Sequence, residues 1–367
     1  MMRSFTVTLH HSNNYGALLQ AYALQRVQQE MGIDNVIFEY PYRDGFYSRV
    51  DLRSPKSAFS AIYHNYHKRL HKKEIIRRNE SFKRFHAQRM KLSRVYASMD
   101  ELRKDDIDAD VLITGSDQVW RFSGNQEFIP ARFLDFGRDS ARRISYAASM
   151  EKPHYTDEQK EKVKGWLSRF QGISLREESA RDYIEKITGF SAQRVLDPVF
   201  LPDRAEWERI AISPKEDEPY ILCYQVQRCE RMQEVVDTLK KRTGYKTIAV
   251  LPESKKYIKT DVSRFDVSPE EFLGLYQNAS VVVTGSFHGT AFGYLFGKPT
   301  YSVVRSESAS RITELAALFG LSDFCIGMNA TIPPVERYDS SAVYQKIAAE
   351  RKRSLLFLSN HLLTGNL

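Results

Sequence analysis

The sequence predicts an α/β protein built from two Rossmann-like lobes that face a central cleft. The length of 367 residues suits two domains better than one. Short apolar runs alternate with stretches of helical spacing along most of the chain, which is typical of parallel sheets covered by helices. The alternation pauses at a proline-rich stretch, 197–219, and then starts again. Ligands of such sheets bind beyond the carboxyl ends of the strands, so we expect the functional site in the cleft.

The first half of the chain opens like a βαβ unit. A strand predicted over residues 5–9 is followed by a polar loop and a helix over 17–31. Residues 57–94 are predicted to form one or two helices that carry a basic face. We assign residues 1–210 to an N-terminal lobe with this helical insertion. Its other predicted elements are strands at 36–39, 111–114, 143–147, 172–175 and 194–196 and helices at 156–170 and 177–186.

The second half repeats the alternation after a boundary predicted near residues 205–218. We assign residues 211–335 to a C-terminal lobe. The remaining residues, 336–367, contain a long helix predicted over 340–363, which we expect to pack back on the N-terminal lobe. The elements predicted for the second lobe are strands at 220–224, 247–251, 281–284 and 300–304 and helices at 230–243, 269–277, 286–296 and 311–319.

Positive charge is concentrated in the segment 64–94, which holds 11 lysines and arginines against two glutamates in a chain of net charge +8. A solvated helical face explains such a run. The alternative is a patch that attracts anionic lipid or the diphosphate of a lipid-linked sugar, since each basic residue near an anionic surface contributes about 1 kcal/mol. Nucleic acid is not expected as a partner, because no aromatic stacking platform accompanies the charge.

The sequence contains no run of the roughly 20 apolar residues that span a bilayer, and its first residues do not resemble a secretory signal. We therefore expect a cytoplasmic protein, with peripheral contact at the inner membrane face through 64–94 as an option. The GxGxxG, Walker A and HExxH motifs are missing, which disfavours a nicotinamide enzyme, an ATPase and a zinc protease. Three cysteines without metal-like spacing are expected as reduced thiols. Neither a metal nor a cofactor is expected.

The most informative run surrounds His288. A buried strand, 281–284, ends before Gly285, and Ser286 can cap a helix whose first turn contains His288. Free backbone amides and the positive end of the helix favour a phosphate or carboxylate there, and Gly289 is expected to let a ligand approach the backbone. A histidine in this position can also transfer protons. A purely structural histidine is the alternative.

Three arginines are candidates for binding an anion. Arg176 lies at the junction of a predicted strand and helix, where its planar guanidinium suits a carboxylate or phosphate. An ordinary salt bridge to Glu177 or Glu178 is the alternative. Arg305 and Arg311 follow the strand after His288, and either can supply a second cation across the cleft.

Polar loops after two strands of the first lobe are candidates for contacts with a hydroxylated ligand. Asp117 can accept a proton from a sugar hydroxyl, and Trp120 can stack on a sugar ring. Asp117 can equally cap the next helix. Asn14 and Gly16, after the first strand, offer a further polar loop facing the same cleft.

Six segments, taken in order, resemble the polysaccharide pyruvyl transferase family. The resemblance extends from about residue 5 to about residue 320, and although each motif is short, the ordered set is fairly specific. The segments are Asn14-Tyr-Gly-Ala-Leu-Leu-Gln-Ala-Tyr-Ala-Leu-Gln25, Thr114-Gly-Ser-Asp-Gln-Val-Trp120, Ser145-Tyr-Ala-Ala-Ser149, Ser174-Leu-Arg-Glu-Glu-Ser179, Leu196-Asp-Pro-Val-Phe200 and Ser286-Phe-His-Gly289.

The resemblance implies a GT-B-like fold and transfer of a pyruvyl group from phosphoenolpyruvate, the donor, to a sugar or lipid-linked oligosaccharide, the acceptor. It implies that Arg176 binds the donor, that His288 is catalytic, and that Arg311, or else Arg305, also contacts the donor. The first lobe would then lie on the acceptor side and the second on the donor side. Many family members have an arginine two residues before the histidine, where this chain has Ser286. Two alternatives remain: a GT-B glycosyltransferase that uses a nucleotide sugar, and a noncatalytic glycan- or lipid-binding protein.

Overall fold

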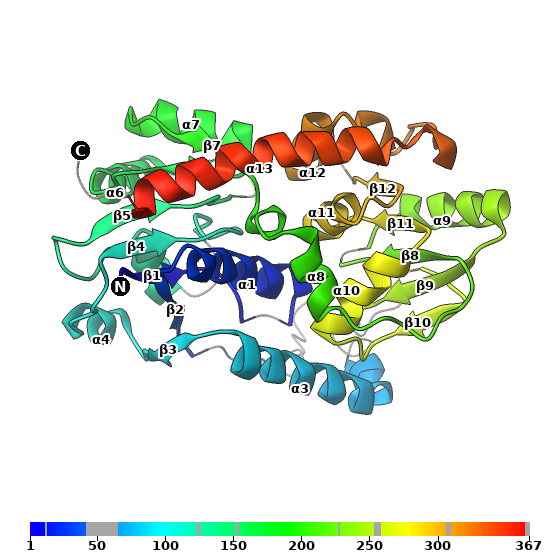
Figure 1. Cartoon of the computed structure of the whole chain (residues 1–367), viewed down its shortest axis with the longest axis horizontal. Coiled ribbons are helices and arrows are strands. Elements are labelled where there is room, and N and C mark those ends of the chain that lie inside the picture. Colours follow the sequence, from blue (N-terminus) through cyan, green and yellow to red (C-terminus); the bar gives the residue numbers. More distant parts are fainter. Residues whose placement is uncertain are drawn as a thin grey trace, which may run out of the picture.

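The computed structural model describes residues 1–11, 13–41, 65–122, 126–150, 154–226, 228–252, 258–305 and 310–363. Two sheets lie side by side in the molecule, with helices packed around both (Figure 1). The first sheet has the strand order β3-β2-β1-β4-β5, and the second has the order β10-β9-β8-β11-β12-β13. All pairings between these strands are parallel, as expected for crossover connections through helices.

The first sheet is formed by apolar strands that are buried at its centre and more exposed at the β3 edge. Ser145, at the end of β5, connects it to a small parallel pair, β6 and β7, because its hydroxyl group donates to the Ser174 carbonyl at 3.0 Å. The elements of this part of the chain are β1 (Arg3–Val7), α1 (Tyr15–Glu30), β2 (Asp34–Glu39), α3 (Lys72–Arg89), β3 (Leu92–Val95), α4 (Met99–Lys104), β4 (Val111–Thr114), α5 (Ile129–Arg132), β5 (Arg142–Ser145), α6 (Asp157–Leu167), β6 (Ser174–Leu175), α7 (Glu178–Thr188) and β7 (Gln193–Arg194).

The second sheet has fully buried central strands, β8 and β11, which explains why nearly all of their residues are apolar. A short 3-10 helix, η2 (Pro198–Phe200), and α8 (Arg204–Ile210) lead into it. Its elements are β8 (Tyr220–Tyr224), α9 (Glu230–Thr243), β9 (Lys246–Val250), β10 (Val262–Arg264), α10 (Pro269–Asn278), β11 (Val281–Thr284), α11 (Phe287–Leu295), β12 (Thr300–Val303), α12 (Ser310–Phe319) and β13 (Cys325–Ile326).

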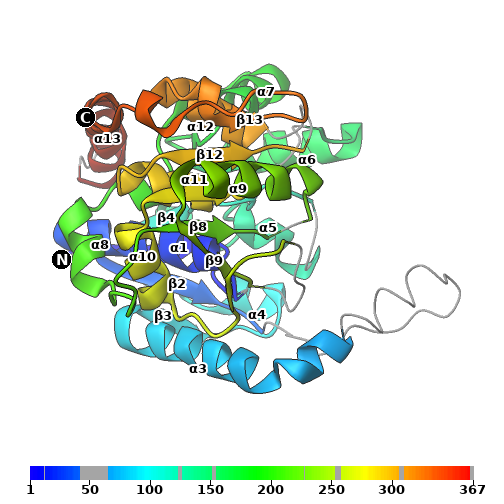
Figure 2. The ribbon, with the colours of Figure 1, turned by 90° about the vertical axis from the view of Figure 1, so that its right-hand side faces the viewer.

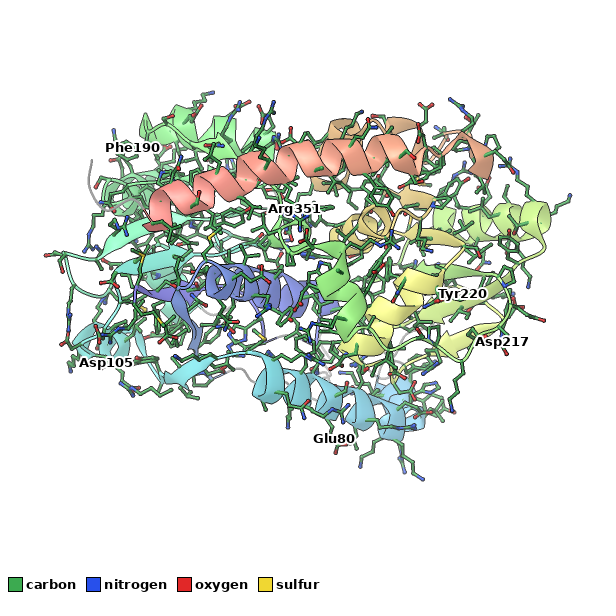
Figure 3. The ribbon with its side chains drawn as sticks, in the orientation of Figure 1. Glu80, Asp105, Phe190, Asp217, Tyr220 and Arg351 are labelled. Atoms are coloured by element: carbon green, nitrogen blue, oxygen red, sulfur yellow. The ribbon has the colours of Figure 1, made fainter. Side chains whose placement is uncertain are left out.

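The last helix, α13 (Ser340–Leu363), crosses both halves of the molecule (Figure 1). Near its start, Val343 and Ile347 belong to the apolar cluster around the second sheet. Near its end, Phe357, Leu358 and Leu362 pack with α1 and the first sheet. Arg351 lies midway along the helix and faces the main body (Figure 3), where its Nε donates to the Leu201 carbonyl at 2.7 Å. The helix therefore joins the two halves through packing at both of its ends.

The basic helix α3 makes a second connection, on the side opposite α13 (Figures 1 and 2). Arg89 Nε lies 3.4 Å from Glu270 Oε1 on α10, and Arg77 Nη1 lies 3.4 Å from Asp266 Oδ2. The His71 ring stacks on Phe265 with 3.9 Å between centroids. Part of the positive charge in 64–94 therefore pairs with acidic residues of the second half. Within the parts that the structure describes, no helix is long and apolar enough to cross a membrane.

The predicted parallel α/β architecture is confirmed, and the main differences from the predicted elements lie at sheet edges. Residues 92–94, predicted as the end of a helix, belong to strand β3. The short edge strands β10 and β13 were not predicted. Helix α3 begins at Lys72 and follows a helical stretch over 65–70, whereas 57–64, the start of the predicted insertion, lies outside the described residues. The limits placed at residues 210 and 335 stay predictions.

Candidate active site

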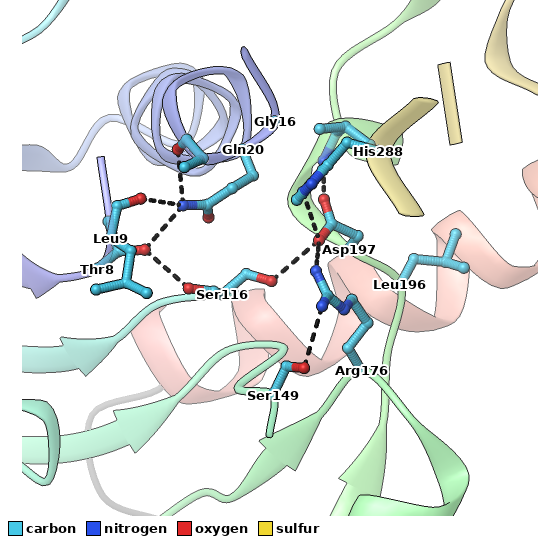
Figure 4. A network of polar contacts seen from close by, with 12 residues as sticks. Thr8, Leu9, Gly16, Gln20, Ser116, Ser149, Arg176, Leu196, Asp197 and His288 are labelled. Atoms are coloured by element: carbon cyan, nitrogen blue, oxygen red, sulfur yellow. Dashed lines mark hydrogen bonds and ion pairs between the residues drawn. The ribbon is translucent and has the colours of Figure 1, made fainter. Parts of the chain in front are cut away.

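Arg176, Asp197 and His288 meet in the interior, although each follows a different strand (Figure 4). Arg176 directly follows β6, Asp197 caps η2, and His288 lies in the first turn of α11. Arg176 Nη1 donates to Asp197 Oδ2 at 2.6 Å, and His288 Nε2 lies 3.5 Å from the same oxygen. Ser116, after β4, donates to this oxygen as well, at 3.1 Å. The Asp197 carboxylate thus contacts side chains from both halves of the chain.

The Arg176 side chain is held by three separate hydrogen bonds. Besides Asp197, its Nε donates to Glu177 Oε1 at 2.8 Å and its Nη2 donates to Ser149 Oγ at 3.0 Å. The guanidinium lies over the Phe287 ring, with 3.9 Å from Cζ to the centroid. From the sequence, a salt bridge to Glu177 is the alternative to anion binding by Arg176. This salt bridge is present, and it is part of a wider network.

Burial and charge act in opposite directions on the ionisable groups of this network. Burial disfavours the charged form of Arg176, but Glu177, Asp197 and Asp117 outweigh it and raise the pKa of the guanidinium. Burial likewise disfavours the charged form of Asp197, yet His288 and Arg176 hold its pKa below the ordinary value. For Glu177 burial prevails over Arg176 and raises the pKa. Asp197 is thus the carboxylate whose charge the site stabilises.

The position of His288 depends on two small residues. Ser286 caps α11 as predicted, and its Oγ accepts from the Gly289 amide at 3.4 Å. The His288 ring lies against Gly16 at the start of α1, where an added Cβ would come within 2.2 Å of His288 Nδ1. Gly289 was expected to admit a ligand, but an added Cβ there would meet Thr284 Oγ1 at 2.3 Å, so this glycine serves packing inside the lobe.

The backbone is strained at two strand ends beside the network. Asp117, after β4, has φ +71°, and Ala147, after β5, has φ +54°, although neither is glycine. Such conformations cost about 1–3 kcal/mol and tend to occur at functional sites. The backbone conformation of Asp117 is held in place, because its carbonyl accepts from Ser149 N at 3.0 Å. Asp117 is near enough to Arg176 to raise its pKa, so this predicted residue belongs to the same site.

A pocket of about 340 Å³ opens beside the network. A volume of this size is at the lower end of the range for small-molecule sites, roughly 300–1,000 Å³. Arg311, one of the two residues predicted as a second cation, lies on its wall together with Arg176. Arg305, the other, lies on the wall of a different pocket, of about 530 Å³, with Thr313 and Cys325.

The amino end of α7, on the same pocket, is occupied by a carboxylate of the chain itself. Glu314 Oε2, from α12, accepts from the Glu178 amide at 2.7 Å, and Glu314 Oε1 accepts from Ser179 Oγ at 2.5 Å. Amides at a helix amino end and its positive dipole favour such an anion. The pocket wall thus contains two positions that bind carboxylates, one at Arg176 and one at α7.

Three predicted acceptor contacts are placed differently by the structure. Trp120 is completely buried, its Nε1 donates to the Arg132 carbonyl at 3.1 Å, and its ring stacks on Phe133. Its predicted stacking on a sugar is therefore wrong. Asn14 caps α1 by accepting from the Gly16 amide at 2.9 Å, which engages its side-chain oxygen in the fold. Gly16 makes room for His288 instead of forming an open polar loop.

Sequence reasoning did not single out three members of the network: Ser116, Ser149 and Asp197. All three lie within segments that carried the family resemblance, which was the available signal. The periodicity of the chain does not reveal that Asp197 turns inward, because it follows the very short strand β7 and precedes a proline.

Similar folds are found among enzymes that act on nucleotide sugars. The HepE protein of Anabaena, solved with UDP and glucose, is 10% identical, with 98% of this chain and 100% of that chain covered at a TM-score of 0.51. The UDP-N-acetylglucosamine 2-epimerase of Rickettsia bellii is 11% identical, with 99% of each chain covered at a TM-score of 0.50. No curated protein shows significant sequence similarity. The chain has the GT-B fold, as predicted, with its polar network between two parallel-sheet halves.

Within that fold, the sequence identifies the family. It matches the family model for polysaccharide pyruvyl transferase over residues 14–307, which is most of the chain. The chain therefore belongs to the polysaccharide pyruvyl transferase family, as its six motifs predicted.

Proposed function

We propose that this protein transfers a pyruvyl group from phosphoenolpyruvate to two hydroxyl groups of a sugar and so forms a cyclic ketal. The observation that carries the proposal is the convergence of Arg176 and His288, from different halves of the chain, on one buried oxygen of Asp197. An anion-binding group and a proton-transferring group then lie side by side. Family membership supplies the reaction class.

The donor is a small molecule with one carboxylate and one phosphate. The pocket wall already binds two carboxylates, Asp197 at Arg176 and Glu314 at the amino end of α7. In our proposal the anionic groups of phosphoenolpyruvate exchange with these internal carboxylates, and Arg311 adds a further cation. The bidentate fork of arginine suits both groups of the donor.

In the proposed reaction, His288 as imidazolium gives its proton to the methylene carbon of the donor. The central carbon becomes electrophilic, and a sugar hydroxyl forms a C–O bond to it while its proton passes to Asp117 or back to His288. A neighbouring hydroxyl then forms the second C–O bond as the bond from the central carbon to the phosphate oxygen breaks. Phosphate leaves with the second hydroxyl proton. Acid catalysis of this kind contributes about 10²–10⁴-fold.

Asp197 has the positioning role in this scheme. Its carboxylate is buried and lies 3.5 Å from His288 Nε2, so it orients the imidazole. The acceptor is proposed to be a sugar, free or lipid-linked, on the side of the first lobe. We also propose a cytoplasmic location, with peripheral membrane contact through the exposed part of 64–94. The proposed reaction needs no cofactor.

The test begins with ligand binding. Phosphoenolpyruvate at 100 times its Kd is expected to stabilise the protein by about 2.7 kcal/mol, measured as a shift in Tm. Arg176→Lys loses the bidentate fork and should weaken binding roughly tenfold or more. Arg305→Lys, in the separate pocket, is the matched control and should bind as the wild type does.

Turnover is measured as phosphate release from phosphoenolpyruvate with a panel of sugar acceptors. His288→Gln should bind the donor but lower kcat by about 10²–10⁴-fold. Stabilisation by UDP without stabilisation by phosphoenolpyruvate would instead support a nucleotide-sugar enzyme. Binding of glycans with no conversion of any acceptor would support the noncatalytic alternative.

A further inference from the structure

A second polar cluster lies at the carboxyl edge of the first sheet, outside the network around Asp197. His10 and His11 follow β1, and Glu39 is the last residue of β2. The two strands are neighbours and parallel, so their carboxyl ends meet at one edge. One nitrogen or oxygen atom from each of the three side chains lies within 4.8 Å of the other two. Because 28 residues separate His11 from Glu39, no spacing motif in the sequence reveals the cluster.

The hydrogen bonding of His10 leaves the lone pair of one ring nitrogen facing His86. Its Nε2 lies 3.0 Å from the Phe38 carbonyl, which fixes the N–H on that nitrogen. The lone pair therefore resides on Nδ1, which lies 3.4 Å from His86 Nε2 on α3. An N–H donated to a backbone carbonyl is the orienting contact that metal-binding histidines usually make.

The distances inside the cluster fit a shared cation better than direct hydrogen bonds. His11 Nδ1 lies 3.3 Å from Glu39 Oε1, and His10 Nδ1 lies 3.4 Å from His86 Nε2. A hydrogen bond from a ring N–H usually spans about 2.7–3.2 Å. Ligands held at about 2.1 Å from a tetrahedral zinc ion are roughly 3.4 Å apart. The separation of His11 Nδ1 and Glu39 Oε1 is close to that value, and the ligand atoms of His10, His11 and Glu39 all lie within 4.8 Å of one another.

The surroundings provide an entrance for an ion. His11, Glu39 and His86 lie on the wall of a pocket of about 530 Å³, through which an ion can enter.

We propose that His10, His11 and Glu39, with His86 beside them, bind one divalent transition-metal ion, for which Zn²⁺ is the best match. Two imidazoles and one carboxylate suit zinc, whereas Mg²⁺ and Ca²⁺ prefer sites made of oxygen. Three protein ligands leave a coordination position directed at the pocket, where water or an oxygen of a bound molecule completes the shell. This inference goes beyond the proposed pyruvyl transfer and does not depend on it.

The experiment measures metal binding by the full chain, independently of catalysis. Chelator-treated protein is dialysed against Zn²⁺, and the metal content is determined by mass spectrometry. We expect one ion per chain. Glu39→Gln removes the charge but keeps the volume, and His11→Phe keeps the ring that packs on His10 and Tyr40. Each should weaken binding roughly tenfold or more.

The matched control is a second His–Glu pair, at the start of α3. His71 Nδ1 lies 3.7 Å from Glu74 Oε1 at the start of α3, and both side chains are partly exposed. His71→Phe and Glu74→Gln should bind Zn²⁺ as tightly as the wild type. Circular dichroism verifies that each variant is folded.

Co²⁺ binding provides a second measurement on the unaltered chain. A tetrahedral site of nitrogen and oxygen ligands gives Co²⁺ a strong visible absorption, which Zn²⁺ should abolish by competition. Fewer than one bound Zn²⁺ per chain, a Co²⁺ spectrum equal to that of the hydrated ion, or full binding in both Glu39→Gln and His11→Phe would each overturn the proposal. These readouts are unaffected if the protein fails to use phosphoenolpyruvate, so the two proposals are tested separately.

Discussion

Replacing Gly16 with alanine tests whether the position of His288 governs activity. An added Cβ would lie 2.2 Å from His288 Nδ1 and 2.3 Å from Cγ, whereas ordinary contacts begin at 3.4 Å. The imidazole must therefore move by about 1.2 Å, the difference between 3.4 and 2.2 Å, or α1 must shift by a similar distance. A misplacement of about 1 Å can cost 10²-fold in rate, which is about 2.7 kcal/mol of transition-state stabilisation.

The effect of this substitution on stability should be smaller than its effect on activity. Alanine improves the helical propensity of α1 by up to about 1 kcal/mol, while overpacking costs about 1–3 kcal/mol. The net change in the free energy of unfolding is thus expected within about 2 kcal/mol of zero, on the destabilising side. Gly165→Ala is the matched control, because nothing lies within 4 Å of the added Cβ in helix α6.

The assay is phosphate release from phosphoenolpyruvate in the presence of an acceptor, with Tm measured in parallel. Gly16→Ala should lose about 10²-fold in kcat while it stays folded, and Gly165→Ala should keep full activity with an equal or higher Tm. If Gly16→Ala retains wild-type activity, the contact with Gly16 does not position the imidazole and our reasoning about His288 is refuted.

Asp197→Asn removes one of the two carboxylates that pair with the buried Arg176 and should cost about 3–5 kcal/mol in urea unfolding, whereas the exposed Asp203→Asn should be nearly neutral. Because the pKa of Asp197 is lowered by folding, its contribution to stability is complete above about pH 4 and is lost as the pH falls through the lower folded value. The stability of Asp197→Asn should therefore decline less between pH 4 and 2, and an unchanged acid limb would contradict the lowered pKa. On α13, Leu358→Ala should cost about 2–5 kcal/mol and the exposed Leu356→Ala about 0.5 kcal/mol or less; equal effects would show that this end of the helix is not docked.

The elements that could be predicted from the sequence are those with a continuous pattern. The run at 281–284 is apolar at its first three positions and buried throughout, and the observed strand has the predicted limits. The helix predicted over 340–363 also has the predicted limits. The edge strands β3 and β13 have only four and two residues and are partly exposed, so they lack both the apolar run and the regular alternation of a longer strand.

The candidate site was predictable in part. Arg176 and His288 each follow the carboxyl end of a strand, in different sheets, and ligand sites of α/β proteins lie beyond such strand ends, which made both residues candidates for one network. Trp120 shows the limit of this argument, because the position after a strand does not reveal whether a side chain turns toward the cleft or the core. The cluster of His10, His11 and Glu39 depends on the pairing of β1 with β2, which only the folded chain reveals.

The two helices that join the halves of the molecule combine apolar packing with ion pairs, and this determines how the connection responds to its medium. Helix α13 buries Leu358 and pairs its Glu350 with Arg194. Helix α3 buries Phe85 and pairs its Arg77 with Asp266. Ionic strength screens such ion pairs but does not weaken apolar contacts, so rising salt should weaken both connections only in part and leave the two halves joined.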